Sequence, residues 1–206
     1  MPLLILPFII ILLSVFSLFR NNSQRALKKQ QDAFWEKEQR ANQTRRQDIS
    51  QLDYIRIPMD AFPFGQYTDE QLASFENILK NLSSRQILNL TGISNTDLKL
   101  QYGAANLPAL TECDTNYSTL LALLANYGEK LYELSHRAEA KQVLEYALSL
   151  GTDVGKNYDL LAAIYEEEGH PEQIGALRSS AENLTSIRKN SILRKLDARK
   201  EQDITT

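Results

Sequence analysis

The chain is poor in the residues that build disulfide scaffolds and metal sites. Its 206 residues include one cysteine and two histidines, which excludes a disulfide framework and a cysteine-based zinc cluster. Eight glycines and six prolines are too few for a collagen-like or low-complexity chain. The sequence has no Gly-rich phosphate loop, His-Glu-x-x-His, nucleophile elbow or Cys-x-x-Cys motif. We therefore predict that the protein is not an enzyme, with no catalytic residues, cofactor, metal or small-molecule substrate.

Charge is spread unevenly along the chain. Residues 20–56 carry nine Lys/Arg against five acids, and residues 57–186 carry eight against eighteen. Residues 187–206 carry six Lys/Arg against three acids. The chain thus consists of a basic neck (residues 20–56), an acidic body (57–186) and a basic tail (187–206). Because the expected folded part is the acidic one, a nucleic acid is not expected as a partner.

An uncharged apolar run opens the chain. Residues 3–19 read LLILPFIIILLSVFSLF, and as a helix they would span about 26 Å. We predict a single-pass transmembrane anchor within residues 1–20, with the lipid bilayer as a partner of residues 3–19. Bases follow the run at Arg20, Arg25, Lys28 and Lys29, which predicts a cytoplasmic body and an external N-terminus. A cleaved signal peptide is the alternative, but no Lys or Arg precedes the run and no small-x-small site follows it.

Six Asn-x-Ser/Thr sequons argue in the opposite direction. In a eukaryotic secretory protein they would favour a lumenal body. We give them less weight than the basic flank, because Asn, Ser and Thr also serve helix caps and turns. They start at Asn21, Asn42, Asn81, Asn89, Asn116 and Asn183.

Residues 21–66 are expected to connect the anchor to the body. Residues 22–52 lack Gly and Pro and are rich in good helix formers, which predicts a polar juxtamembrane helix. The heptad Leu27, Phe34, Ala41 ends at Asp48, so a coiled coil is not predicted. Two prolines and a glycine in residues 53–66 indicate an extended linker whose apolar residues pack on a helix.

The body, residues 67–186, is predicted to be all-α. A capping box that starts at Thr68 opens a helix to about Leu82. A weaker start signal at Ser83 predicts a helix that Gly92 ends. Ser94 is expected to open a third helix that Gly103 ends, and Asn106 to start a short fourth helix. No segment among them alternates like a strand.

Residues 117–186 show a spacing of 34. Their helices pair as hairpins, and residues of one hairpin recur 34 positions later in similar size classes. A small residue at positions 128 and 162 lets the paired helices cross closely. A generic helical bundle with accidental spacing is the alternative. The equivalent pairs are Leu124/Tyr158, Tyr127/Leu161, Gly128/Ala162, Leu131/Tyr165 and Ala147/Ala181.

The second hairpin resembles the tetratricopeptide repeat (TPR) family. Its first helix reads Tyr158-x-x-Leu-Ala-x-x-Tyr165-x-x-x-Gly169, and the resemblance covers residues 117–186. Ser135 departs from the family pattern where Gly is usual, Thr152 where Pro is usual, and Arg178 where a large apolar residue is usual. The resemblance implies stacked helix hairpins, and residues 68–112 are expected to cover the N-terminal side of the stack.

The resemblance also implies a concave face lined by the first helix of each hairpin. The family's clamp for acidic peptides needs Lys and Asn at positions that Ala125, Glu129, Asp159 and Ala163 occupy here. We therefore expect a protein partner with a basic or amphipathic segment. The predicted partner-binding residues are Glu129, Tyr132, Glu133, Asp159, Glu166 and Glu167.

Together these features predict a membrane-tethered, TPR-like adaptor or scaffold. The anchor would raise the body's effective concentration near membrane partners. The alternative is a non-catalytic structural subunit of a membrane complex, without a free groove. The basic tail, residues 187–206, is expected to begin as a solvated helix, with a membrane or partner contact as the other option.

Overall fold

The computed structural model describes residues 24–25 and 27–203, and side chains up to residue 199. These residues form helices, turns and loops and no strand, which confirms the all-α prediction for this part of the chain. None of the described helices is both long and apolar enough to cross a membrane. The predicted anchor, residues 3–19, lies outside the described residues.

The described chain forms two compact units that do not follow the expected segments. Unit 1 comprises the described residues up to Gln51 together with Ile93–Pro108. Unit 2 comprises Leu52–Gly92 together with the described residues from Ala109 onward. Part of the expected body, which includes α3 (Asn95–Tyr102), therefore belongs with the neck.

Unit 1 pairs the neck helix with α3. The first helix covers 24–25 and 27–43 and stops short of the predicted 52. Lys37 Nζ lies 2.6 Å from Asp97 Oδ1, and Glu38 is ion-paired with Lys99. After the helix, the backbone passes so close to Gly103 that a Cβ there would lie 2.4 Å from the Arg45 carbonyl oxygen. Gly103 therefore ends α3, as predicted, and its lack of a side chain also lets the backbone of Arg45 and Arg46 pass close to it.

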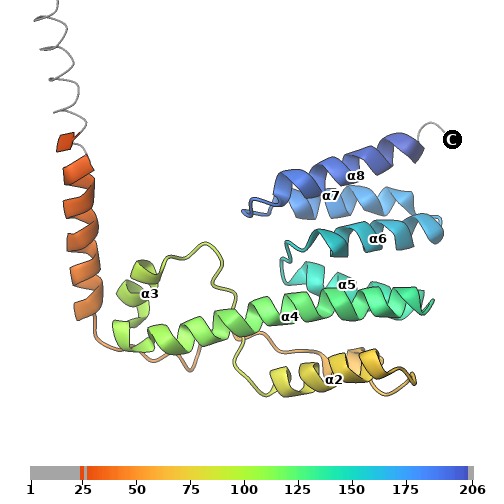
Figure 1. The fold of residues 1–206 in the computed structure, drawn as a ribbon, viewed down its shortest axis with the longest axis horizontal. Helices are drawn as coiled ribbons and strands as arrows, with labels where there is room; N and C mark the ends of the chain where they lie inside the picture. Colours follow the sequence, from red (N-terminus) through yellow and green to blue (C-terminus); the bar gives the residue numbers. More distant parts are fainter. Residues whose placement is uncertain (1–23, 26, 204–206) are drawn as a thin grey trace, which may run out of the picture. The chain divides into compact units, whose positions relative to one another are not determined.

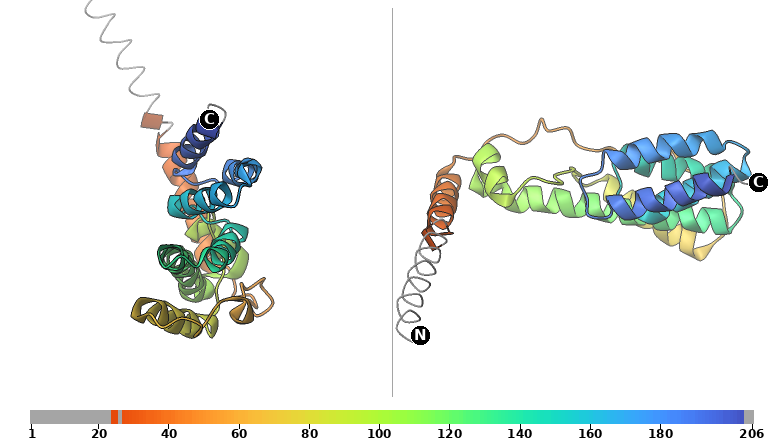
Figure 2. Two further views of the ribbon diagram at one scale, coloured as in Figure 1. Left: turned by 90° about the vertical axis from the view of Figure 1, so that its right-hand side faces the viewer. Right: turned by 90° about the horizontal axis from the view of Figure 1, so that it is seen from above.

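Unit 2 is a stack of antiparallel helices (Figures 1 and 2). The helix α4 starts at the last two residues of unit 1 and continues through unit 2. In Figure 1, α2 lies along α4, and α6, α7 and α8 follow on the opposite side of the α4–α5 hairpin. The bounds are η2 Met59–Ala61, α2 Glu70–Ser83, α4 Leu107–Glu133, α5 Arg137–Ser149, α6 Gly155–Glu167, η4 Pro171–Gln173, α7 Ile174–Glu182 and α8 Lys189–Asp203.

The α2 prediction is confirmed, with a different cap. The carboxylate of Asp69, not Thr68, accepts the backbone N–H groups of Gln71 and Leu72, each at 2.9 Å. Asp69 has extended backbone angles and precedes the first helical residue, which is the N-cap geometry.

The prediction of a helix over 83–92 is wrong. Residues 86–90 form no regular secondary structure, and Ile87, Leu88 and Leu90 are buried. Their backbone groups are satisfied by other segments: the Leu88 N–H bonds the Cys113 carbonyl, and the Ile87 carbonyl accepts the Ile55 N–H. Tertiary hydrogen bonds and burial on neighbouring elements outweigh the local helix pattern.

A helix begins directly after Asn106, as predicted, but the expectation that it is short is wrong. The structure has one 27-residue helix, α4, which runs from Leu107 through the first hairpin. Pro108 does not interrupt it, because it occupies the first turn, where its missing N–H has no intrahelical partner.

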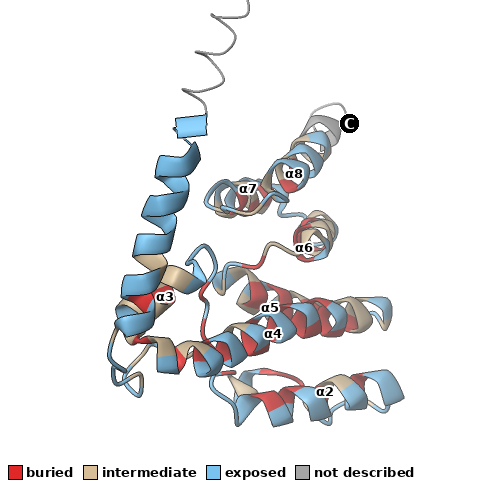
Figure 3. Cartoon of the chain, turned by 60° about the vertical axis from the view of Figure 1, so that its left-hand side comes forward, coloured by how far each residue is buried: buried red, intermediate tan, exposed pale blue. Residues whose placement is uncertain are grey.

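The core of unit 2 follows the helix faces that the spacing of 34 predicts (Figure 3). At Gly128 on α4, a Cβ would lie 2.6 Å from Leu144 Cδ2 on α5, so a larger residue there would displace the Leu144 side chain. The linker joins this core, because Ile57 and Phe62 are buried in it. The expectation that linker residues pack on a helix is therefore confirmed.

The basic tail, as far as residue 203, forms a helix as expected, but the expectation that this helix is solvated is wrong. Ile192 and Leu196 of α8 are buried in the unit 2 core. The carboxylate of Asp153, before α6, accepts the Ser186 hydroxyl at 2.6 Å and lies 3.8 Å from the Arg188 guanidinium. The segment is a packed helix because its apolar residues recur at i and i+4 on one face.

Candidate partner-binding site

The two helix hairpins have matching turns 34 residues apart. Ser135 and Gly169 both adopt positive φ, at +67° and +76°. The next N–H then bonds back to the preceding helix: His136 to the Leu131 carbonyl at 2.9 Å, and His170 to the Tyr165 carbonyl at 2.8 Å. The same helix-ending motif closes α4 and α6, and it also closes α5, where Gly151 has φ +81° and the Thr152 N–H bonds the Ala147 carbonyl at 3.2 Å.

The predicted site residues of α4 contact α6 and α5. Glu129 Oε2 lies 2.5 Å from Lys156 Nζ at the start of α6. The hydroxyl of Tyr132 donates to Glu167, and Glu167 also accepts from the Arg137 Nε at 2.7 Å. The Arg137 guanidinium covers the Tyr132 ring at 3.7 Å from its centroid. Tyr132, Arg137 and Glu167 thus form one polar cluster.

Hydrogen bonding sets the ionisation of this cluster. The hydrogen bonds from Tyr132 and Arg137 lower the pKa of Glu167 below its usual value. The same bond to Glu167 raises the pKa of Tyr132. At neutral pH the cluster therefore holds a neutral phenol, a carboxylate and a guanidinium.

The other two site residues of α6, Asp159 and Glu166, are paired with α8. Asp159 Oδ2 lies 2.5 Å from Lys195 Nζ, and Glu166 Oε2 lies 2.7 Å from Arg199 Nη1. Glu133 is exposed at the end of α4. The structure thus brings five of the six predicted residues into hydrogen bonds or ion pairs with the chain itself, and these bonds link α4, α6 and α8.

Sequence reasoning missed the bases that complete this face. Lys195 and Arg199 are four residues apart and lie beside the buried positions Ile192 and Leu196. This i, i+4 pattern on an amphipathic segment was the available signal, because it predicts a helix with an apolar face and an adjacent basic face.

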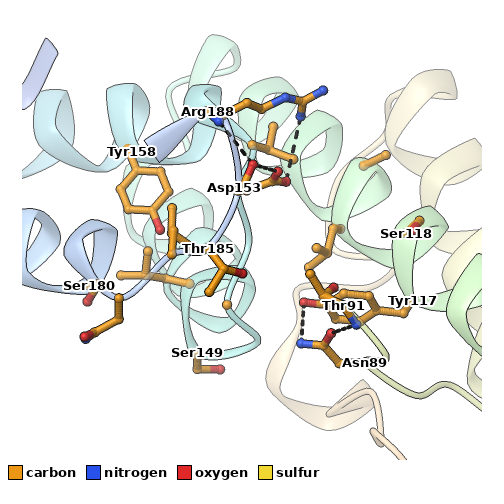
Figure 4. A pocket seen from close by; sticks show the side chains of 18 of the residues that line it. Asn89, Thr91, Tyr117, Ser118, Ser149, Asp153, Tyr158, Ser180, Thr185 and Arg188 are labelled. Atoms are coloured by element: carbon orange, nitrogen blue, oxygen red, sulfur yellow. Dashed lines mark hydrogen bonds and ion pairs between the residues drawn. The ribbon is translucent and has the colours of Figure 1, made fainter. Parts of the chain in front are cut away.

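A separate hollow of about 950 Å³ lies in unit 2, beside the ends of the hairpins (Figure 4). Tyr117 on α4 donates its hydroxyl to the Leu150 carbonyl at 2.7 Å and accepts the Asn89 amide at 3.0 Å. Tyr158 donates to the Thr152 carbonyl at 3.0 Å. Hydroxyl and amide side chains also line the hollow, and they include Thr91, Ser118, Ser149, Ser180, Asn183 and Thr185.

Asp153 and Arg188 are the charged residues among those that line the hollow, and they form an ion pair. Within 24–25 and 27–199, no three His, Cys, Asp or Glu side chains lie together where they could hold a metal ion. No protein-family model matches this chain, and neither a curated protein nor a solved structure is significantly similar to it.

Proposed function

We propose that this chain is a membrane-tethered, TPR-like adaptor that binds a protein partner through the face formed by α4 and α6. The observation that carries the proposal is the pair of matching turns at Ser135 and Gly169. The hydrogen bonds of these two turns match at a spacing of 34 residues, which supports a repeated helix hairpin. Stacked hairpins of this kind present extended binding surfaces.

The charge pairs on this face suit a basic or amphipathic partner. The side chains of Glu129, Asp159 and Glu166 are about one-third exposed, and their own partners lie at the surface as well. Exposed ion pairs contribute about 0–1 kcal/mol each, so exchanging Lys156 or Lys195 for a partner's base costs little. Tyr132 adds an aromatic contact, and Glu133 offers an exposed carboxylate.

The tether is the apolar run of residues 3–19. We propose that it spans the bilayer with the N-terminus outside and units 1 and 2 in the cytoplasm, in accord with the bases that follow the run. Confinement to the membrane raises the local concentration of unit 2 near membrane-bound partners.

A non-catalytic structural subunit of a membrane complex is the second candidate. It is favoured by the same pairing of charges, because Lys195 and Arg199 of the chain itself already neutralise Asp159 and Glu166. In that case neighbouring subunits would contact other surfaces of the units.

Site-specific photo-crosslinking in cells distinguishes the two candidates. A photo-reactive amino acid replaces Glu133 at the face or, as a control, Asn81, which is exposed on α2. An adaptor gives a discrete product from position 133 and none from position 81. Equal products from both positions would favour the structural subunit, and a product from position 81 alone would contradict binding at the face.

Charge reversal gives an independent test of the same proposal. Glu129→Lys/Glu166→Lys should abolish the product at position 133, whereas Glu112→Lys, at an exposed acid of α4, should leave it unchanged. Far-ultraviolet circular dichroism of each variant checks that the helices remain folded.

A further inference from the structure

Unit 1 exposes large apolar side chains along its first helix, from Leu27 near the start to Trp35 in the middle. Leu27 is 64% exposed, Phe34 53% and Trp35 59%. Phe34 and Trp35 contact each other edge to face, with ring centroids 5.5 Å apart. Apolar side chains scattered singly on a surface need no explanation, but three within nine residues of one helix do.

A fourth exposed apolar residue belongs to the same unit. Ile93, 41% exposed, directly precedes Ser94, the N-cap of α3. The contacts of Thr96 with Glu38 and of Asp97 with Lys37 align the start of α3 with residues 37–38 of the first helix. The other end of α3 meets residues 45–47. We call Leu27, Phe34, Trp35 and Ile93 the apolar tip.

The chain that precedes the apolar tip restricts what can cover it. The apolar run ends at Phe19, and Gln24 follows five residues later. At no more than about 3.6 Å per residue, Leu27 lies within about 29 Å of the end of that run. If the run crosses a bilayer, the apolar tip is held within reach of the bilayer surface.

Charge at this end of the helix fits an anionic surface. Arg25, Lys28 and Lys29 flank Leu27, and no acid occurs in the described chain before Asp32. Basic residues near a bilayer that contains anionic lipid favour its surface by about fivefold each. Tryptophan with neighbouring bases is characteristic of side chains that lie at the headgroup level.

We propose that the apolar tip, together with Arg25, Lys28 and Lys29, is a docking surface for anionic phospholipid headgroups. This inference rests on the proposed membrane tether and adds to it a second contact between the folded part and the bilayer. Trp35 and Phe34 insert among the headgroups, while the three bases pair with lipid phosphate and carboxylate groups.

The test uses Trp35, which is the only tryptophan of the sequence. The full chain is placed in nanodiscs of phosphatidylcholine alone or with phosphatidylserine, each with and without bromine-labelled acyl chains. We expect a blue-shifted Trp35 emission that brominated lipid quenches, more strongly when phosphatidylserine is present. Emission that stays water-like and is quenched by aqueous iodide but not by brominated lipid would overturn the inference.

Two variants separate the docking surface from general lipid contact. Lys28→Gln/Lys29→Gln should lower the docking constant by about 30-fold, read as quenching across a salt series. Ile78→Ser removes a comparably exposed residue, 43%, from α2 and should leave the quenching unchanged. Equal quenching in the Lys28/Lys29 variant and the unsubstituted chain, in the presence of phosphatidylserine, would refute the electrostatic part.

Retention of the chain on the nanodisc reports the tether independently. If the chain is retained but the Trp35 emission stays water-like, the result supports the proposed anchor and contradicts the proposed docking surface. A chain that does not remain with the nanodisc overturns both.

Discussion

Ser135 occupies a turn position that costs stability, and replacing it by glycine should stabilise the protein. Its φ of +67° is a conformation that disfavours side chains by about 1–2 kcal/mol. Glycine removes that cost but loses about 0.5–1 kcal/mol to its greater freedom in the unfolded chain. We therefore expect Ser135→Gly to raise the free energy of unfolding by about 0.5–1 kcal/mol. Each kcal/mol corresponds to a rise of about 2–4 °C in Tm for a chain of this length.

The matching turn supplies the control. Gly169 has φ +76°, and no atom lies within 4 Å of an added Cβ. Gly169→Ser should therefore lower the free energy of unfolding by about the amount by which Ser135→Gly raises it. Urea unfolding followed by circular dichroism at 222 nm measures both, with an unchanged slope. If Ser135→Gly leaves the urea midpoint unchanged or lowers it while Gly169→Ser is destabilising, the two turns are not equivalent and the reasoning fails.

Three further predictions concern the core, the C-terminal helix and alkaline pH. Gly128→Ala should destabilise the protein by about 1 kcal/mol, because overpacking against Leu144 outweighs the gain in helix propensity. Gly175→Ala, with open space around its Cβ, should stabilise the protein instead. The urea midpoints of the two variants test this difference in sign. Leu196→Ala should cost about 2–4 kcal/mol and Lys195→Ala less than 1 kcal/mol; similar costs in thermal melts would contradict a packed α8. Burial raises the pKa of Tyr158 to about 12, so its stabilising contribution is complete below pH 10 and is lost as pH rises from 10 through 12. That loss amounts to about 2–3 kcal/mol, and Tyr158→Phe should flatten the alkaline decline in urea midpoint; an unchanged decline would refute it.

Local signals predicted the helices wherever the same residues also serve the tertiary structure. Ser94 caps α3, Gly103 ends it, and the stripe of α2 faces the core, so period and caps were sufficient there. Ile87, Leu88 and Leu90 resemble the start of a helix, but their backbone bonds lie on segments distant in sequence, such as Ile55. No window of neighbouring residues contains that information.

The candidate face was predictable only in part, for a similar reason. Periodicity placed Glu129, Tyr132, Asp159 and Glu166 on the first helices of two hairpins. The partners of the α6 acids come from α8, more than 30 residues away, and charge counts by segment cannot show such pairing. The Tyr117–Leu150 bond beside the hollow likewise joins positions 33 residues apart.

The order in which the chain builds the two units has a consequence for its integrity. The chain crosses from one unit to the other after Gln51, after Gly92 and after Pro108. A single backbone cut in the exposed turn around Gly92 would leave fragments that each contribute to both units. The Lys37–Asp97 ion pair would then join the two fragments without a covalent bond. The Ile55–Ile87 hydrogen bond would lie within the first fragment. A nicked molecule should therefore migrate as an intact protein until it is denatured.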